Sequence, residues 1–169
     1  TSFRSYFGVT PKEIYNLDRK YKQFISRLRE VYSIMEIAGL KQPPFNTTLM
    51  GCIKGASDYF DIDLSPAMLY GLTGHAFLIN IHEALCPSGP YVWKYDGFIP
   101  LLRNVGIEWV ASYHYGKDSS EEERKKAEQH LVNVLNEGGL GILNFMENQL
   151  VSGYDEEGFH FLVPWGIDD

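Results

Sequence analysis

Two side chains, Thr48 and Glu147, are the first candidates for chemistry in this sequence. The Thr48 hydroxyl could act as a nucleophile, although a hydroxyl needs an adjacent base of suitable proton affinity. Glu147 could supply that base as a carboxylate tuned by burial. Each residue also has a simpler interpretation. Thr48 would then only cap a helix, and Glu147 would form, with Asn148 and Gln149, a polar ledge that hydrogen-bonds a ligand or a neighbouring loop.

Cys52 and His75 are the candidates for a thiol-based site. Cys52 lies one helical turn after Thr48 and on the side of the expected helix, where the N-terminal dipole activates a thiol little. We therefore expect Cys52 to be a small buried hydrophobe that reacts slowly and forms no disulfide with Cys86. His75 follows Gly74, which lets a backbone approach a ligand closely. These two residues are expected to border a binding site, or else His75 is a core histidine with internal hydrogen-bond partners.

The spacing of His75, His82 and Cys86 also permits a metal site, because His82 and Cys86 would share one face of a helix. Pro87 ends any helix at that point, however, and a strand would place the two histidines on opposite faces. We therefore expect no metal ion and no cofactor.

These residues are positioned by helices that come mostly first and strands that come mostly last, which predicts an α+β fold. Capping residues, apolar periodicity and glycine stops predict helices at 11–39, 48–60, 66–70, 96–105 and 121–136. Apolar runs predict strands at 107–113, 140–145, 149–152 and 159–163, whereas 76–81 fits either a strand or a buried helix. The turn Asp155-Glu-Glu-Gly158 predicts that the last two strands form a hairpin.

The stretch from Glu147 to Trp165 resembles the hairpin that carries the base in papain-like cysteine peptidases of the bacteriocin-leader-processing type. That pattern is a histidine, five residues, then Gly-Tyr-Asp, a turn and a strand ending in Asp-Pro. This chain has Gly153-Tyr-Asp155, with Glu147 at the histidine position and Val163 where the pattern has Asp. The resemblance therefore places Glu147 at the position of the base.

The helix that carries the nucleophile in that family has a counterpart upstream. Asp58-Tyr-Phe-Asp-Ile-Asp-Leu-Ser65 matches the end of that helix, and counting back without a gap places the nucleophile at Thr48. A gap would place it at Cys52 instead. Gly71-Leu-Thr-Gly-His-Ala-Phe77 is similar to a step after this helix in the N-terminal domain of the butirosin biosynthesis protein H family, where a papain-like fold carries acyl transfer. The resemblance covers residues 45–166.

The resemblance implies a papain-like α+β fold, with N-terminal helices packed on an antiparallel sheet and a cleft between them. Residues 1–44 would be a helical extension and 45–169 the papain-like domain, which a further C-terminal part could follow. With the catalytic set substituted, we expect a non-proteolytic domain that binds a peptide-like or acyl-amide ligand through Thr48, Gly74, His75, Glu147 and Asn148. Its setting would be secondary metabolism or peptide maturation.

Two alternatives stay open: an active acyltransferase or amidohydrolase that uses Cys52 with His75 or His82, and a purely structural module.

Composition limits the classes of partner that the chain is expected to bind. The chain has 169 residues and a formal net charge of −7, with no basic stripe to bind a nucleic-acid backbone. No signal peptide or long apolar run is apparent, so we expect no membrane partner and a cytoplasmic location.

Overall fold

The described chain folds as helices packed against one antiparallel sheet, a mixed α+β arrangement. The computed structural model describes residues 34–81, 83–84, 95–114, 118–145 and 147–164. Its elements are β1 (Met35–Glu36), α3 (Thr48–Tyr59), α4 (Pro66–Leu72), η1 (His75–Phe77), α5 (Tyr95–Phe98), η3 (Ile99–Val105), α6 (Glu121–Asn136), β2 (Ile142–Phe145), β3 (Glu147–Tyr154) and β4 (Phe159–Phe161), where η denotes a 3-10 helix.

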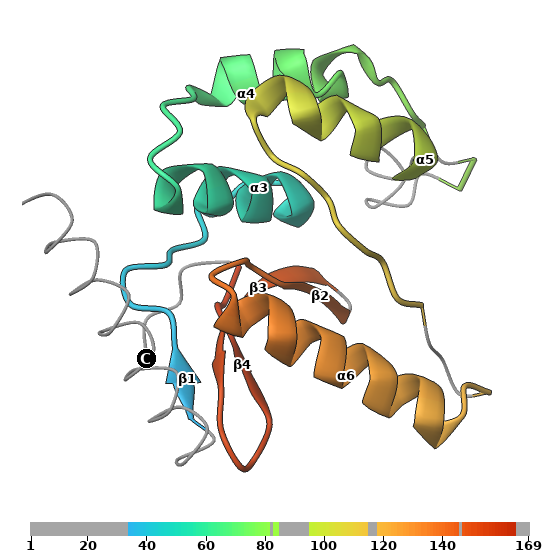
Figure 1. The fold of residues 1–169 in the computed structure, drawn as a ribbon. Coiled ribbons are helices and arrows are strands. Elements are labelled where there is room, and N and C mark those ends of the chain that lie inside the picture. The colour runs from blue at the N-terminus through green and yellow to red at the C-terminus, as the bar shows by residue number, and fades with distance from the viewer. Residues whose placement is uncertain (1–33, 82, 85–94, 115–117, 146, 165–169) are drawn as a thin grey trace, which may run out of the picture.

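Strand β3 organises the sheet, because each of the other three described strands pairs antiparallel with it. β2 pairs with its first half, so that Phe145 lies opposite Glu147, and β1 and β4 pair with its second half. Figure 1 shows α3 between this sheet and the layer of α4 and α5, while α6 lies along the sheet. α3 thus connects the helical layer to the sheet.

Two groups of buried apolar side chains form the core on either side of α3. The first joins α3, α4 and η3 through Leu49, Met50, Ile53, Leu64, Leu69, Phe98, Leu102 and Val105. The second joins α3, α6 and the sheet through Met35, Ile37, Leu40, Cys52, Leu135, Leu150 and Val151. Because one helix contributes to both groups, two of its faces are buried, and a change at one of its buried residues affects one layer or the other.

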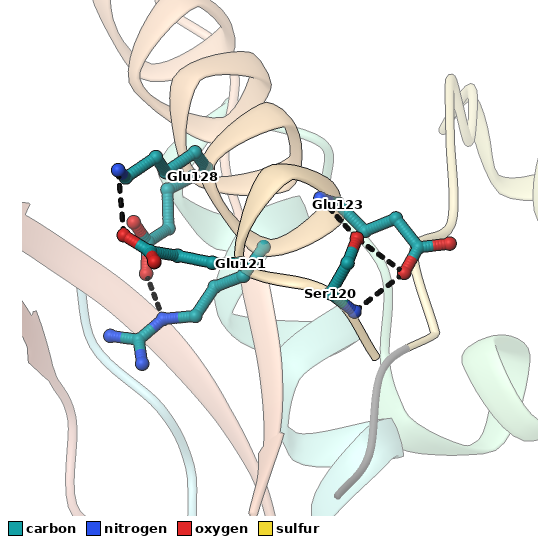
Figure 2. A network of polar contacts seen from close by, with 6 residues as sticks. Ser120, Glu121, Glu123 and Glu128 are labelled. Atoms are coloured by element: carbon teal, nitrogen blue, oxygen red, sulfur yellow. Dashed lines mark hydrogen bonds and ion pairs between the residues drawn. The ribbon is translucent and has the colours of Figure 1, made fainter. Parts of the chain in front are cut away.

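Several helices begin and end where the sequence predicts. Helix α6 starts at a capping box: Ser120 Oγ accepts from the Glu123 backbone N–H at 3.2 Å, and Glu123 Oε2 accepts from the Ser120 N–H at 2.8 Å (Figure 2). Ser65 Oγ caps α4 by accepting from the Met68 N–H. The terminal hairpin is also confirmed, since Asp155 N–H donates to Gly158 O at 2.9 Å.

Three predicted elements are wrong within the described residues. The helix expected to run to Gly39 is replaced at its end by β1, whose residues pair with β3; most of that predicted helix lies outside the described residues. Segment 107–113 forms no helix and pairs with no described strand. Segment 76–81 is neither a strand nor a buried helix. Its first two residues lie in η1, residues 78–81 form no helix or strand, and Phe77, Ile79 and Ile81 are 80%, 87% and 78% exposed.

Candidate functional site

Thr48 and Glu147 meet in the structure, as the two counts along the sequence predicted. Thr48 is the first residue of α3 and Glu147 is the first residue of β3. The Thr48 hydroxyl donates to Glu147 Oε2 at 2.8 Å, although 99 residues separate them in sequence. The two positions that the resemblance assigns to nucleophile and base are therefore in direct contact.

The hydroxyl oxygen of Thr48 is engaged from a second direction as well. It accepts from the Asn148 backbone N–H at 3.1 Å and from Asn148 Nδ2 at 3.5 Å. Asn148 Oδ1 in turn accepts from Asn144 Nδ2 at 3.1 Å, across the β2–β3 pair. We call Gln42, Thr48, Asn144, Glu147 and Asn148 the Thr48 cluster. Its hydrogen bonds join the start of α3 to the start of β3.

The interpretation of Thr48 as a helix cap alone is wrong. The N-cap position of α3 is held by Thr47, whose side chain makes no capping hydrogen bond. Thr48 is 4% exposed and directs its hydroxyl to β3 instead. The alternative for Glu147, a polar group that hydrogen-bonds a neighbouring segment, agrees with this geometry. No acidic residue lies in the first turn of α3, so the Glu147 carboxylate places a negative charge near a helix N-terminus, where it is favourable.

Gln42 belongs to the cluster and was not found from the sequence. Its Nε2 donates to Asn148 O at 2.9 Å, and its Oε1 accepts from the Leu150 N–H at 2.8 Å. The side-chain amide therefore pairs with two alternate residues of β3, as a neighbouring strand would. Gln42 is 9% exposed. A glutamine in a connector carries no local signal of this role, because the partner strand lies more than a hundred residues away.

Two glycines on α3 let these segments approach each other. A Cβ added to Gly51 would lie 2.6 Å from Pro43 O, and one added to Gly55 would lie 2.2 Å from Lys41 O. Gly51 and Gly55 are four residues apart and so share one face of the helix. This face accepts the backbone of residues 41–43, which holds Gln42 against β3.

Cys52 lies in the core, as expected. It is fully buried among the apolar residues between α3 and the sheet, and its thiol is free. Burial raises the pKa of the Cys52 thiol to about 12. The thiolate, which is the nucleophilic form, is therefore disfavoured at neutral pH. Cys86, the other candidate for a disulfide, lies outside the described residues.

His75 lies in an aromatic group within the helical layer. Its ring contacts Tyr70 edge-on, with 5.3 Å between ring centroids, and lies 6.4 Å from the ring of Phe98. Burial lowers the pKa of the His75 imidazole, which favours the neutral form. Gly74 precedes it with φ +76°, a left-handed conformation that suits glycine. Neither Gly74 nor His75 belongs to the Thr48 cluster. His75 is 8% exposed, which agrees with the expected position in the core, whereas the internal hydrogen-bond partners expected for its ring stay a prediction.

The metal hypothesis concerns His75, His82 and Cys86, and the last two lie outside the described residues. Within the part that is described, no three side chains among histidine, cysteine, aspartate and glutamate gather as a metal site would require. No helix in that same part combines the length and apolar character needed to cross a bilayer.

Neither of two hollows among the described residues is lined by Thr48 or Glu147. One of them, of about 380 Å³, lies between α6 and the β3–β4 hairpin. Its lining consists of Lys125, Glu128, Gln129, Val132, Tyr154, Asp155, Gly158 and Phe159. The smaller is lined by Tyr113, His114, Glu123 and Lys126. The sequence predicted a cleft with Thr48 and Glu147 on facing walls. In the structure these two side chains are instead joined directly by a hydrogen bond.

Comparison of the chain with protein-family models, with curated proteins and with solved structures found no match.

Proposed function

We propose that this chain is a papain-like domain that binds a peptide-like or acyl-amide ligand at the Thr48 cluster and does not cleave it. One observation carries the proposal: the Thr48 hydroxyl donates to the Glu147 carboxylate at 2.8 Å. The positions that correspond by resemblance to nucleophile and base are adjacent in space, yet they hold a hydroxyl and a carboxylate. The supporting arrangement is a helix start packed against a strand start, with a hairpin following that strand.

The chemistry of the pair argues against peptide cleavage. A carboxylate is a weak base toward an alcohol, and hydroxyl nucleophiles are normally activated by a histidine, an amine or a metal ion. Thr48 is also buried, and its oxygen accepts the Asn148 N–H, so a lone pair needed for attack is already used. Glu147 and Asn148 are half-buried and Asn144 is exposed, so a ligand can reach the edge of the cluster even though Thr48 lies beneath it.

The second candidate, an acyltransferase or amidohydrolase that uses Cys52, is less well supported. A reactive cysteine needs an electropositive and partly exposed setting. Cys52 is fully buried among apolar side chains, and its pKa is raised rather than lowered. The third candidate, a purely structural module, is favoured by the burial of Thr48 and by the two backbone bonds of Gln42, which hold the layers together.

A restoration experiment tests the papain-like assignment without a known ligand. In a chain with Cys86→Ser, the double variant Thr48→Cys/Glu147→His would place a thiol beside an imidazole. Such pairing lowers a thiol pKa to about 3.5–7.5. We expect iodoacetamide to alkylate Cys at position 48 faster at pH 6 in this double variant than in a variant that lacks the histidine. Cys52 is retained as a buried internal reference.

The control is Thr48→Cys alone, in which the Glu147 carboxylate beside the thiol raises its pKa and suppresses alkylation at pH 6. In both variants the thiol occupies the same position, so the ratio of their rates reports the exchange of a carboxylate for an imidazole beside it. Equal rates at pH 6 would refute the papain-like assignment. Hydrolysis of fluorogenic peptides by the unmodified chain, lost on Thr48→Ala, would refute the claim that the domain does not cleave.

A further inference from the structure

The Glu147 carboxylate is the one group of the Thr48 cluster that can only accept hydrogen bonds. One of its oxygens, Oε2, accepts from the Thr48 hydroxyl at 2.8 Å. The side-chain amides of Asn144 and Asn148 each use one N–H inside the cluster, and each keeps a second N–H. The second carboxylate oxygen of Glu147 therefore carries the charged capacity that remains at the accessible edge, and a ligand group that binds this oxygen must donate a hydrogen bond.

The charge at this edge is negative and is not matched by the described residues. No lysine, arginine or histidine among them forms an ion pair with Glu147. Glu147 is half-buried, and a partly desolvated carboxylate is best stabilised by a cationic donor, because charge-assisted hydrogen bonds are about twice as strong as neutral ones. The formal charge of the whole chain, −7, attracts cations in the same sense.

We propose that the ligand of the Thr48 cluster carries a protonated amine, which binds to the Glu147 carboxylate and to the Asn144 side-chain oxygen. This inference rests on the proposed function and adds the chemical class of the recognised group. The cluster selects for the amine over an acylated amine, since acylation removes both the positive charge and most of the donors. Asn148 fixes the geometry by holding Asn144 on one side and Thr48 on the other.

The test uses two probes that differ only at the recognised group, alanyl-alaninamide and N-acetyl-alanyl-alaninamide. Binding is followed at pH 7 through the backbone amide resonances of Asn148 and Leu150. We expect the free amine to bind at least tenfold more tightly than the acetylated peptide. Glu147→Gln keeps an acceptor for the Thr48 hydroxyl but removes the charge, and it should abolish the tenfold preference. Glu157→Gln, in the exposed hairpin turn, removes the same charge elsewhere and should retain the preference.

The outcomes separate this inference from the proposed function. Equal binding of the two peptides at Asn148 and Leu150 would overturn the amine inference while leaving a peptide-binding domain. Binding of neither peptide at these residues would overturn both. A preference that survives Glu147→Gln, or that is lost equally in Glu157→Gln, would show that the overall charge of the chain selects the amine. That result would also refute the inference.

Discussion

Replacing Thr48 by valine tests whether the hydroxyl joins α3 to β3. Valine has nearly the shape of threonine but carries a methyl group in place of the hydroxyl, so the exchange removes the hydrogen bonds of Thr48 and little volume. The Asn148 N–H then loses its acceptor at 3.1 Å, and the Glu147 carboxylate loses a donor at 2.8 Å. Because Glu147 is half-buried, water can replace its lost donor, and the main cost falls on the backbone N–H. Leaving such a group unsatisfied costs about 1–3 kcal/mol.

Urea unfolding followed by circular dichroism measures this loss, and the melting temperature should fall by roughly 4–8 °C for a loss of about 2 kcal/mol at this chain length. Thr47→Val is the matched control, since Thr47 is 7% exposed and its side chain makes no capping bond. Its cost should be smaller than that of Thr48→Val, because Thr47→Val removes no side-chain capping hydrogen bond. Thr48→Ser keeps the hydroxyl and should lose only about 0.8 kcal/mol for one buried methyl group.

The difference in stability cost between Thr48→Val and Thr47→Val decides whether the Thr48 hydroxyl joins α3 to β3. If Thr48→Val costs no more than Thr47→Val, the hydrogen bonds of Thr48 do not hold the layers together, and the structural reasoning fails. If Thr48→Ser is as damaging as Thr48→Val, the methyl group and not the hydroxyl is what the site requires.

Three further predictions concern other parts of the chain. Gly153→Ala should lower the free energy of unfolding by about 1–3 kcal/mol or more, because the added Cβ would lie 2.1 Å from the carbonyl oxygen of Met35 in β1. Gly71→Ala, whose Cβ would meet open space, should not destabilise the fold, and equal melting temperatures of the two variants would contradict this reasoning. Alkylation of native Cys52 should be slow and should rise with pH without a plateau below pH 10, since its pKa is about 12; a plateau near pH 8 would show an activated thiol. The hydrogen bond from the Glu157 N–H, followed by that from the His160 side chain, holds the pKa of Asp155 below its ordinary value. The stabilisation of the folded hairpin by Asp155 is therefore present above pH 4 and is lost as the pH falls through the pKa of Asp155 in the folded state. Amide exchange in the hairpin should accelerate in that range, and Asp155→Asn should remove this pH dependence.

Local chemistry was sufficient to predict the helices with strong start and stop signals. Ser120 and Glu123 satisfy each other at the start of α6 through groups three residues apart, so the sequence alone specifies that end. The same holds for the terminal hairpin, where Asp155 accepts from the turn it opens. The proximity of Thr48 and Glu147 was also predicted, although only by comparison with a known pattern and not from propensity.

The remaining features depended on partners that are distant in sequence. Met35 belongs to the apolar pattern that predicted a helix up to Gly39. It lies in strand β1 instead, because β3 offers backbone groups with which it pairs. The segment 107–113 has strand-like residues but no described strand beside it, so its apolar alternation was not sufficient. Gln42 became part of the candidate site because α3 and β3 bring its amide to two backbone groups of β3. The sequence by itself determined which short segments could start, turn or stop, because those bonds close within a few residues. Only the tertiary structure decided which segments pair and which polar groups are buried, because each of those bonds needs a partner from across the chain.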